Sequence, residues 1–251
     1  FEYNNISQFD ELIYKYKDRI AAVIMEPIRS HYPKNNFLEH IRAQTEEMGI
    51  VLIFDEISSG FRIAAGGAHL KLGVNPDMAI FGKAISNGYP MSVLIGKNDV
   101  MSMAQDSFIS STYWTERVGL AAAIATINKF IANDVHEKLI NLGCKVQSIW
   151  RESFSSIDLD VGINGISPMS TFSFVDEKSL YYKTFLIREM LKSSILTTTS
   201  YYASYSHQEN HIEEYKKEFA KSVQLLKHHI NKPVNNITNE EICHAGFQRL
   251  T

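Results

Sequence analysis

An acid and an amine each follow a short apolar run in this sequence. Asp55 comes directly after Val51–Phe54, and Lys83 follows Met78–Phe81 with only Gly82 between them. A carboxylate at the carboxyl end of a buried parallel strand lies where ligands bind in open α/β sheets. The 28 residues that separate the acid from the amine make about one strand-helix-strand excursion, so we expect both at the same edge of a sheet.

Each of these two side chains also has a simpler interpretation. In the simpler interpretation, Asp55 only caps the turn that follows its strand. With Glu56 it would also suit a magnesium-holding pair in an ATPase, but that class needs a GxxxxGK[ST] loop, and Lys83 is followed by Ala84. Lys83 is either a surface lysine with a buried stem or an amine that forms a Schiff base with an aldehyde cofactor. Gly82 leaves room for such a cofactor to approach the backbone.

The elements around these residues alternate between strands and a helix. Apolar runs predict strands at Ile20–Met25, Ile50–Phe54, Asp77–Phe81 and Met91–Ile95, and the spacing of apolar residues predicts a helix over Phe37–Met48. The run at Ile50–Phe54 is typical of a strand that is covered on both faces. The pattern predicts an α/β layer with a mostly parallel sheet.

The later part of the chain has a different character. The pattern predicts an α+β domain after a linking helix, with the division at residues 1–133 and 134–251. A helix is expected over Arg117–Phe130 before this division. After it, the expected helices are Val135–Trp150, Leu180–Leu191 and Ile212–Leu226, and the expected β segments are Ser170–Phe174 and Ile195–Thr199.

The bulk composition excludes several functional classes. The 251 residues carry a formal net charge of −3, which gives no reason to expect nucleic acid or an anionic membrane as a partner. No apolar run is long enough to span a bilayer. Cys144 and Cys243 show no metal-binding spacing, the histidines form no metal motif, and two thiols in such a chain favour the reducing cytoplasm. We therefore expect no metal and a cytoplasmic location.

Four ordered motifs together resemble the class III pyridoxal-phosphate aminotransferases, and within them the branch of glutamate-1-semialdehyde aminomutase. The motifs are Ala22-Val-Ile-Met-Glu-Pro27, Leu52-Ile-Phe-Asp-Glu-Ile-Ser-Ser-Gly-Phe-Arg62, Pro76-Asp-Met-Ala-Ile-Phe-Gly-Lys-Ala-Ile-Ser-Asn-Gly-Tyr-Pro90 and Ser111-Thr-Tyr-Trp-Thr-Glu-Arg117. The resemblance implies the type I fold of aspartate aminotransferase. The chain would then hold part of the large, cofactor-binding domain, with its mostly parallel sheet, and a small C-terminal α+β domain.

The resemblance also implies a role for individual residues. Lys83 would hold pyridoxal 5′-phosphate as a Schiff base and then move the proton between substrate and cofactor. Asp55 would pair with the pyridinium nitrogen and keep the ring protonated. Ile57 would pack on one face of the ring. Thr115 would donate its hydroxyl to the cofactor phosphate of a neighbouring subunit, which implies a homodimer with an active site shared across the interface.

The sequence departs from the family pattern at several points. Arg29 stands where many relatives carry a glutamine, and it either binds a substrate carboxylate or phosphate or points to solvent. Ser58 and Ser59 replace a more usual small-Thr pair. The family's phosphate-cradling loop and ring-stacking aromatic, which come well before these motifs, have no counterpart here, and the chain has no initiating Met. We therefore expect the chain to be the later part of a longer protein.

The leading hypothesis is an aminotransferase that moves an amino group between a small-molecule donor and acceptor through Lys83. One alternative is an aminomutase of the glutamate-1-semialdehyde type, an isomerase that keeps the amine within one molecule. The other alternative is a truncated, non-catalytic chain that only dimerises or binds a ligand.

Overall fold

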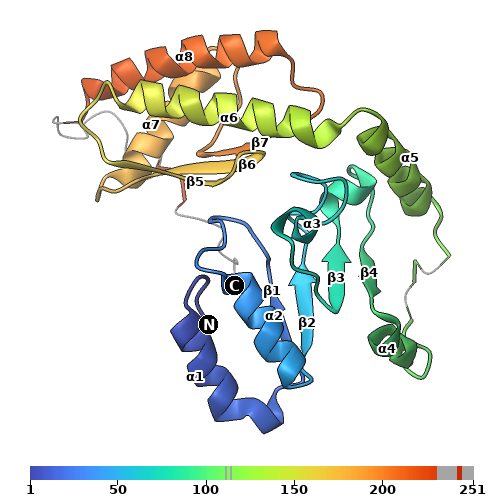
Figure 1. The fold of residues 1–251 in the computed structure, drawn as a ribbon. Coiled ribbons are helices and arrows are strands. Elements are labelled where there is room, and N and C mark those ends of the chain that lie inside the picture. Colours follow the sequence, from blue (N-terminus) through green and yellow to red (C-terminus); the bar gives the residue numbers. More distant parts are fainter. Residues whose placement is uncertain (111, 114, 231–241, 245–251) are drawn as a thin grey trace. The chain divides into compact units, whose positions relative to one another are not determined.

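The computed structural model describes residues 1–110, 112–113, 115–230 and 242–244. The chain divides into two compact units, Phe1–Lys138 and Leu139–Thr251. Figure 1 shows the helices and strands of both.

The first unit is built on a four-stranded sheet. Its strands are β1 (Ala22–Met25), β2 (Val51–Asp55), β3 (Met78–Phe81) and β4 (Val93–Gly96), in that order across the sheet. The first three strands run parallel, and β4 pairs with β3 antiparallel. The prediction of a mostly parallel sheet is therefore confirmed.

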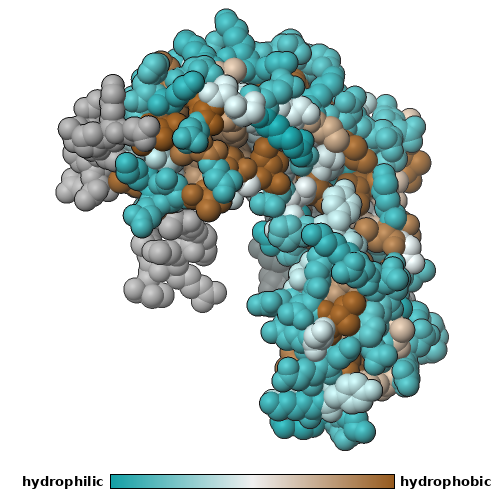
Figure 2. Space-filling view, turned by 60° about the vertical axis from the view of Figure 1, so that its left-hand side comes forward, coloured by the Kyte–Doolittle hydropathy of each residue, from teal (hydrophilic) through white to brown (hydrophobic). Residues whose placement is uncertain are grey.

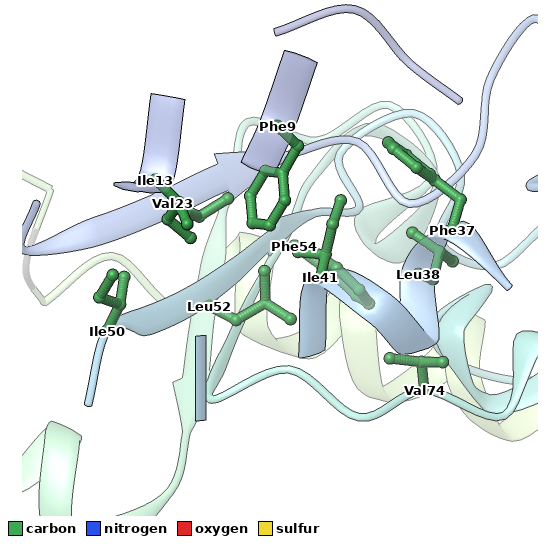
Figure 3. Close-up of a cluster of buried hydrophobic side chains, with 10 residues drawn as sticks. All are labelled: Phe9, Ile13, Val23, Phe37, Leu38, Ile41, Ile50, Leu52, Phe54 and Val74. Carbon is green, nitrogen blue, oxygen red and sulfur yellow. The ribbon is translucent and has the colours of Figure 1, made fainter. Parts of the chain in front are cut away.

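Two helices cover one face of this sheet. α2 (Phe37–Glu47) was predicted, and it ends before Gly49, which adopts a left-handed φ of 65°. α1 (Ile6–Tyr16) was not predicted. Between these helices and the strands lies a close-packed apolar cluster, shown in Figure 3, whose members are Phe9, Ile13, Val23, Phe37, Leu38, Ile41, Ile50, Leu52, Phe54 and Val74.

The other face of the sheet differs from the prediction. Leu52 and Phe54 of β2 are fully buried, but Val51 and Ile53, which point to the opposite face, are only half-buried. On β1 next to them, Ile24 is 61% exposed. The expected burial of β2 on both faces is wrong for this chain, because α1 and α2 pack on one side only. Figure 2 shows further apolar side chains (brown) that reach the surface.

Shorter helices lie before and between the strands of the first unit and after β4. They are η1 (Lys17–Arg19), α3 (His69–Leu72), η2 (Lys83–Ser86), α4 (Asn98–Met101) and η3 (Ser102–Ala104), and the longer α5 (Val118–Ala132) comes last. α5 packs against η2, the turn that begins at Lys83. The helix predicted over Arg117–Phe130 is thus present.

The second unit joins three long helices to an antiparallel sheet. The helices are α6 (Val135–Phe154), whose first four residues belong to the first unit, α7 (Ser179–Lys192) and α8 (Glu209–Lys227). The strands are β5 (Val161–Ile166), β6 (Met169–Phe174) and β7 (Ser200–Tyr202). Aromatic rings fill the space between helices and strands. Phe172 of β6 lies 4.9 Å from Trp150, 5.2 Å from Phe154 and 5.9 Å from Phe219, measured between ring centroids.

Two β segments of the second unit differ from the sequence prediction. Residues 195–199 form no strand. The edge of β6 from Met169 to Thr171 pairs instead with β7, which begins at Ser200. β5 was missed because Gly162, Asn164 and Gly165 hide its strand character, and Gly165 has a φ of 91°.

Within the described residues, no single helix has the length and apolar character to cross a membrane. Only the bent pair of α5 and α6 satisfies both criteria when the two are taken together.

Candidate active site

Asp55 lies at the carboxyl end of β2, where it pairs in register with Ile80 of β3. Its Oδ1 accepts a hydrogen bond of 2.9 Å from the backbone N–H of Ile57. One carboxylate oxygen therefore caps the following turn, as the simpler interpretation proposed. Within the described part of the chain, the other oxygen has no hydrogen-bond donor. The half-buried side chain thus keeps one oxygen for a ligand.

Lys83 follows β3 at the same edge of the sheet. Its backbone φ of 46° lies in the left-handed region, which is unusual for a residue other than glycine, asparagine or aspartate. Such a conformation persists only where the surrounding structure enforces it, and it is frequent at functional sites. The Nζ atom donates a hydrogen bond of 2.7 Å to Oγ of Ser58, in the turn after β2. The amine therefore bridges the ends of two neighbouring strands.

Ile57 contacts the strand end that precedes Lys83. A Cβ atom placed on Gly82 would sit 3.4 Å from the Ile57 side chain, so the strand end before Lys83 is in contact with this apolar group. An acid, an amine and a branched apolar side chain are thus brought together on two adjacent strand ends. All three were expected at one site.

Glu56 is a buried acid whose role sequence reasoning missed. It is fully buried, and it accepts hydrogen bonds of 2.6 to 2.9 Å from Ser59 Oγ, the backbone N–H groups of Ala68 and His69, and His69 Nδ1. Burial raises the pKa of Glu56, but these hydrogen bonds, that of the His69 side chain foremost, outweigh burial and hold the pKa below its usual 4.5. Since both oxygens are occupied, Glu56 is not available as half of a magnesium-binding pair.

A local signal for this buried acid exists in the sequence. A Cβ atom on Gly67 would lie 2.2 Å from His69 Nδ1 and 2.8 Å from Glu56 Oε1. Only glycine lets the backbone N–H groups of the 67–69 turn reach the carboxylate. The Gly66-Gly67 pair shortly before His69 is therefore a sequence signal that the backbone approaches another group closely at this point.

Asp77 is a second buried acid that the sequence reasoning did not single out. It lies just before β3, at the amino-terminal ends of the parallel strands, whereas Asp55 lies at their carboxyl ends. It accepts a hydrogen bond of 2.8 Å from the backbone N–H of Leu52 and pairs with Arg42 at 2.9 Å and Lys97 at 2.8 Å. Burial raises the pKa of Asp77, but the hydrogen bonds and the Arg42 charge hold it below its usual value. Its function is to fix β2 and β3 in register, which places Asp55 and Lys83 together.

In the described residues, no hydrogen bond joins the other two expected site residues to this group. Arg29 pairs with Glu26 at 2.9 Å, and both line a pocket of about 390 Å³ beyond the end of β1. Thr115 is exposed in the turn before α5, and no hydrogen bond joins it to Lys83 or Asp55 in the described residues. Ser111 and Trp114 of the same motif lie outside the described residues.

Among the described residues, no group of three or more His, Cys, Asp or Glu side chains is arranged to hold a metal ion. The potential ligands near the site are an amine, one free carboxylate oxygen and hydroxyl groups. These suit an organic carbonyl compound with a basic ring nitrogen better than a cation.

The sequence is similar to those of several known proteins. The family model "Aminotransferase class-III" matches residues 2–159. The glutamate-1-semialdehyde 2,1-aminomutase of Methanococcoides burtonii is 36% identical over 191 residues, which cover 73% of this chain and 45% of that protein. The 3-aminobutyryl-CoA aminotransferase of Cloacimonas acidaminovorans is 35% identical over 195 residues, which cover 73% of this chain and 46% of that protein. The chain spans about half the length of the curated relatives it matches.

Solved structures show the same fold. The FumI protein of Sphingopyxis sp. MTA144, solved in its PLP internal aldimine form, matches with a TM-score of 0.82 and 24% identity over 90% of this chain and 56% of that one. An omega-transaminase from Sphaerobacter thermophilus matches with a TM-score of 0.80 and 23% identity, over 89% and 56%. The fold is therefore that of the PLP-dependent transaminases, as the motifs predicted. Since the family model covers more than half of the sequence, the chain belongs to the class III aminotransferase family.

Proposed function

We propose that the protein is a pyridoxal-phosphate-dependent aminotransferase in which Lys83 carries the cofactor. The observation that supports this most directly is the position of the Lys83 amine. It lies at the carboxyl edge of a parallel sheet, 2.7 Å from Ser58, on the strand end next to that of Asp55. Family membership alone would not assign these residues, because one fold serves many chemistries.

The residues at this edge fit the cofactor. A primary amine condenses with an aldehyde, a carboxylate oxygen without a donor can take the ring N–H, and a branched apolar side chain can lie on the ring face. When bound, pyridoxal phosphate supplies an electron sink for a carbanion. Asp55 would keep the ring nitrogen protonated, Ile57 would exclude water from one side, and the Lys83 amine would carry a proton to and from the substrate carbon.

Two alternatives remain as proposals beside the aminotransferase. The likeness to the aminomutase of M. burtonii favours an isomerase that keeps the amine within one molecule. The other alternative is a non-catalytic chain that only dimerises or binds a ligand. Against the second stands the combination of Lys83, Asp55 and Ile57 at one edge, since a decayed site has no reason to keep it.

The remaining assignments belong to the same proposal. Thr115, which is exposed, would reach the cofactor phosphate of a second subunit, so the complete protein would be a homodimer. Arg29 would bind a substrate carboxylate once released from Glu26. We divide the chain at residues 1–133 and 134–251 into part of the large domain and the linking helix with the small domain. The two free cysteines favour the cytoplasm.

Cofactor titration tests the assignment of Lys83. We expect the purified protein to develop the visible absorbance of lysine-bound pyridoxal phosphate, and Lys83→Ala to abolish it. The matched control is Lys71→Ala, because Lys71 is also exposed but lies in α3, which precedes β3 in the chain. Its spectrum should equal that of the wild type. Equal absorbance in Lys83→Ala and wild type would rule out the proposed function.

Amino-group transfer then separates the three activities. An aminotransferase consumes a donor and an acceptor in equal amounts, whereas an aminomutase converts glutamate-1-semialdehyde without an added donor. A non-catalytic chain would do neither after loading with cofactor.

A further inference from the structure

Ser58 occupies a position at the site that the family resemblance does not explain. It follows Asp55 by three residues and is 7% exposed. Its Oγ accepts the 2.7 Å hydrogen bond from Nζ of Lys83. From the sequence alone, Ser58 was noted only because Ser58-Ser59 replaces the small-Thr pair that is more usual in the family.

The two adjacent serines have separate partners. Ser59 Oγ donates to the buried Glu56 at 2.6 Å, whereas Ser58 Oγ faces Lys83. The turn that holds them is fixed on both sides. The Nε–H of Arg62 donates to the carbonyl of Ser58 at 2.9 Å, and a Cβ on Gly60 would come within 2.7 Å of Phe81. The Ser58 hydroxyl is therefore presented from a rigid support.

The side chain that it contacts has no comparable support. Lys83 is exposed and flexible along its four-carbon stem. Throughout the described ranges, the Ser58 hydroxyl is the one hydrogen-bond partner of its amine, and no carboxylate lies within ion-pair distance. Without this bond, the Lys83 side chain would sample many rotamers. This conformational freedom must be lost before the amine can react at one position.

We propose that Ser58 is a positioning residue that holds the Lys83 amine at the cofactor-binding edge. This inference rests on the proposed function. In the attachment step, the neutral Lys83 nitrogen adds to the cofactor aldehyde carbon, a C=N bond forms, and the carbonyl oxygen leaves as water, with no change in oxidation state. Each turnover sets the amine free again, and Ser58 then receives it and keeps it in place for proton transfer.

The variant Ser58→Ala tests this role because it removes the hydroxyl without adding volume. We expect cofactor attachment, followed by stopped-flow absorbance, to slow about three- to tenfold, the usual weight of one hydrogen bond. In the cofactor-free protein, competitive acetylation of Lys83 measured against Lys71 should instead rise roughly twofold or more, because the amine is released to solvent. Local unfolding would also expose the amine, so the free energy of unfolding of Ser58→Ala is measured beside the two rates by urea denaturation.

Two further variants complete the experiment. Ser58→Thr keeps the hydroxyl and should restore both rates, which also covers the case in which Ser58→Ala fails to fold. Ser59→Ala, the matched control, should lower stability and leave both rates unchanged. Unchanged rates in Ser58→Ala would overturn the inference. A wild-type protein that never attaches the cofactor would instead overturn the proposed function, while acetylation would still show whether Ser58 holds the amine.

Discussion

Replacing Asp55 by asparagine is expected to reduce amino-group transfer by at least about a hundredfold while the protein stays folded. The amide oxygen of asparagine can still accept the hydrogen bond from the Ile57 N–H, so the turn after β2 is preserved. The negative charge is lost, however, and with it the means to keep the cofactor ring nitrogen protonated. The measurement is kcat with a saturating donor and acceptor.

The control for this substitution is Asp18→Asn, an exposed aspartate in η1 far along the chain from the site. It makes the same chemical change and should leave kcat within about twofold of the wild type, as is usual for surface positions. A kcat of Asp55→Asn equal to that of the control would remove Asp55 from the proposed site. Asp55 would then serve only as a cap for its turn.

Replacing Glu56 by glutamine is expected to lower the free energy of unfolding by about 3 kcal/mol. The buried carboxylate accepts four hydrogen bonds, and glutamine offers an NH₂ group where one of its two oxygens now stands. That NH₂ group would face N–H or O–H donors. Urea denaturation measures the change, and Glu47→Gln, an exposed glutamate in α2, is the matched control.

The effect of Glu56 should also depend on pH in a definite direction. Its pKa in the folded protein lies below the usual 4.5, so the unfolded chain binds a proton more readily than the folded one. The stabilisation is complete above pH 4.5 and is lost as the pH falls through the folded-state pKa. The difference in unfolding free energy between wild type and Glu56→Gln should therefore shrink on acidification. A difference that grows below pH 4.5 would contradict this.

The sequence pattern predicted the helices and strands whose formation depends on residues close together in the chain. α2 is marked by its apolar spacing and by Gly49, and the strand ends that carry Asp55 and Lys83 are marked by continuous apolar runs. β7 was misplaced because residues 195–199, mostly β-branched, favour an extended chain. Only the register with β6 decides which residues form a ladder. The exposed face of β1 and β2 was also not predictable, since hydrophobicity does not tell which neighbours are present.

The site shows the same division. Asp55, Ile57 and Lys83 were recognised because their types and spacing are characteristic. Ser58 and Glu56 were not, because their roles depend on contacts across 25 and 13 residues, Ser58 with Lys83 and Glu56 with His69. Such contacts arise only when the turn after β2 meets β3 and α3. Arg29 could be placed only by structure, which pairs it with Glu26.

Chemical trapping gives the most direct test of the central claim that Lys83 carries the cofactor. The protein is loaded with pyridoxal phosphate, reduced with borohydride and digested, and the modified peptide is located by mass spectrometry. We expect a pyridoxyl group on Lys83, in stoichiometric amount and absent from Lys83→Ala. A stable adduct on any other lysine, or none at all, would contradict it.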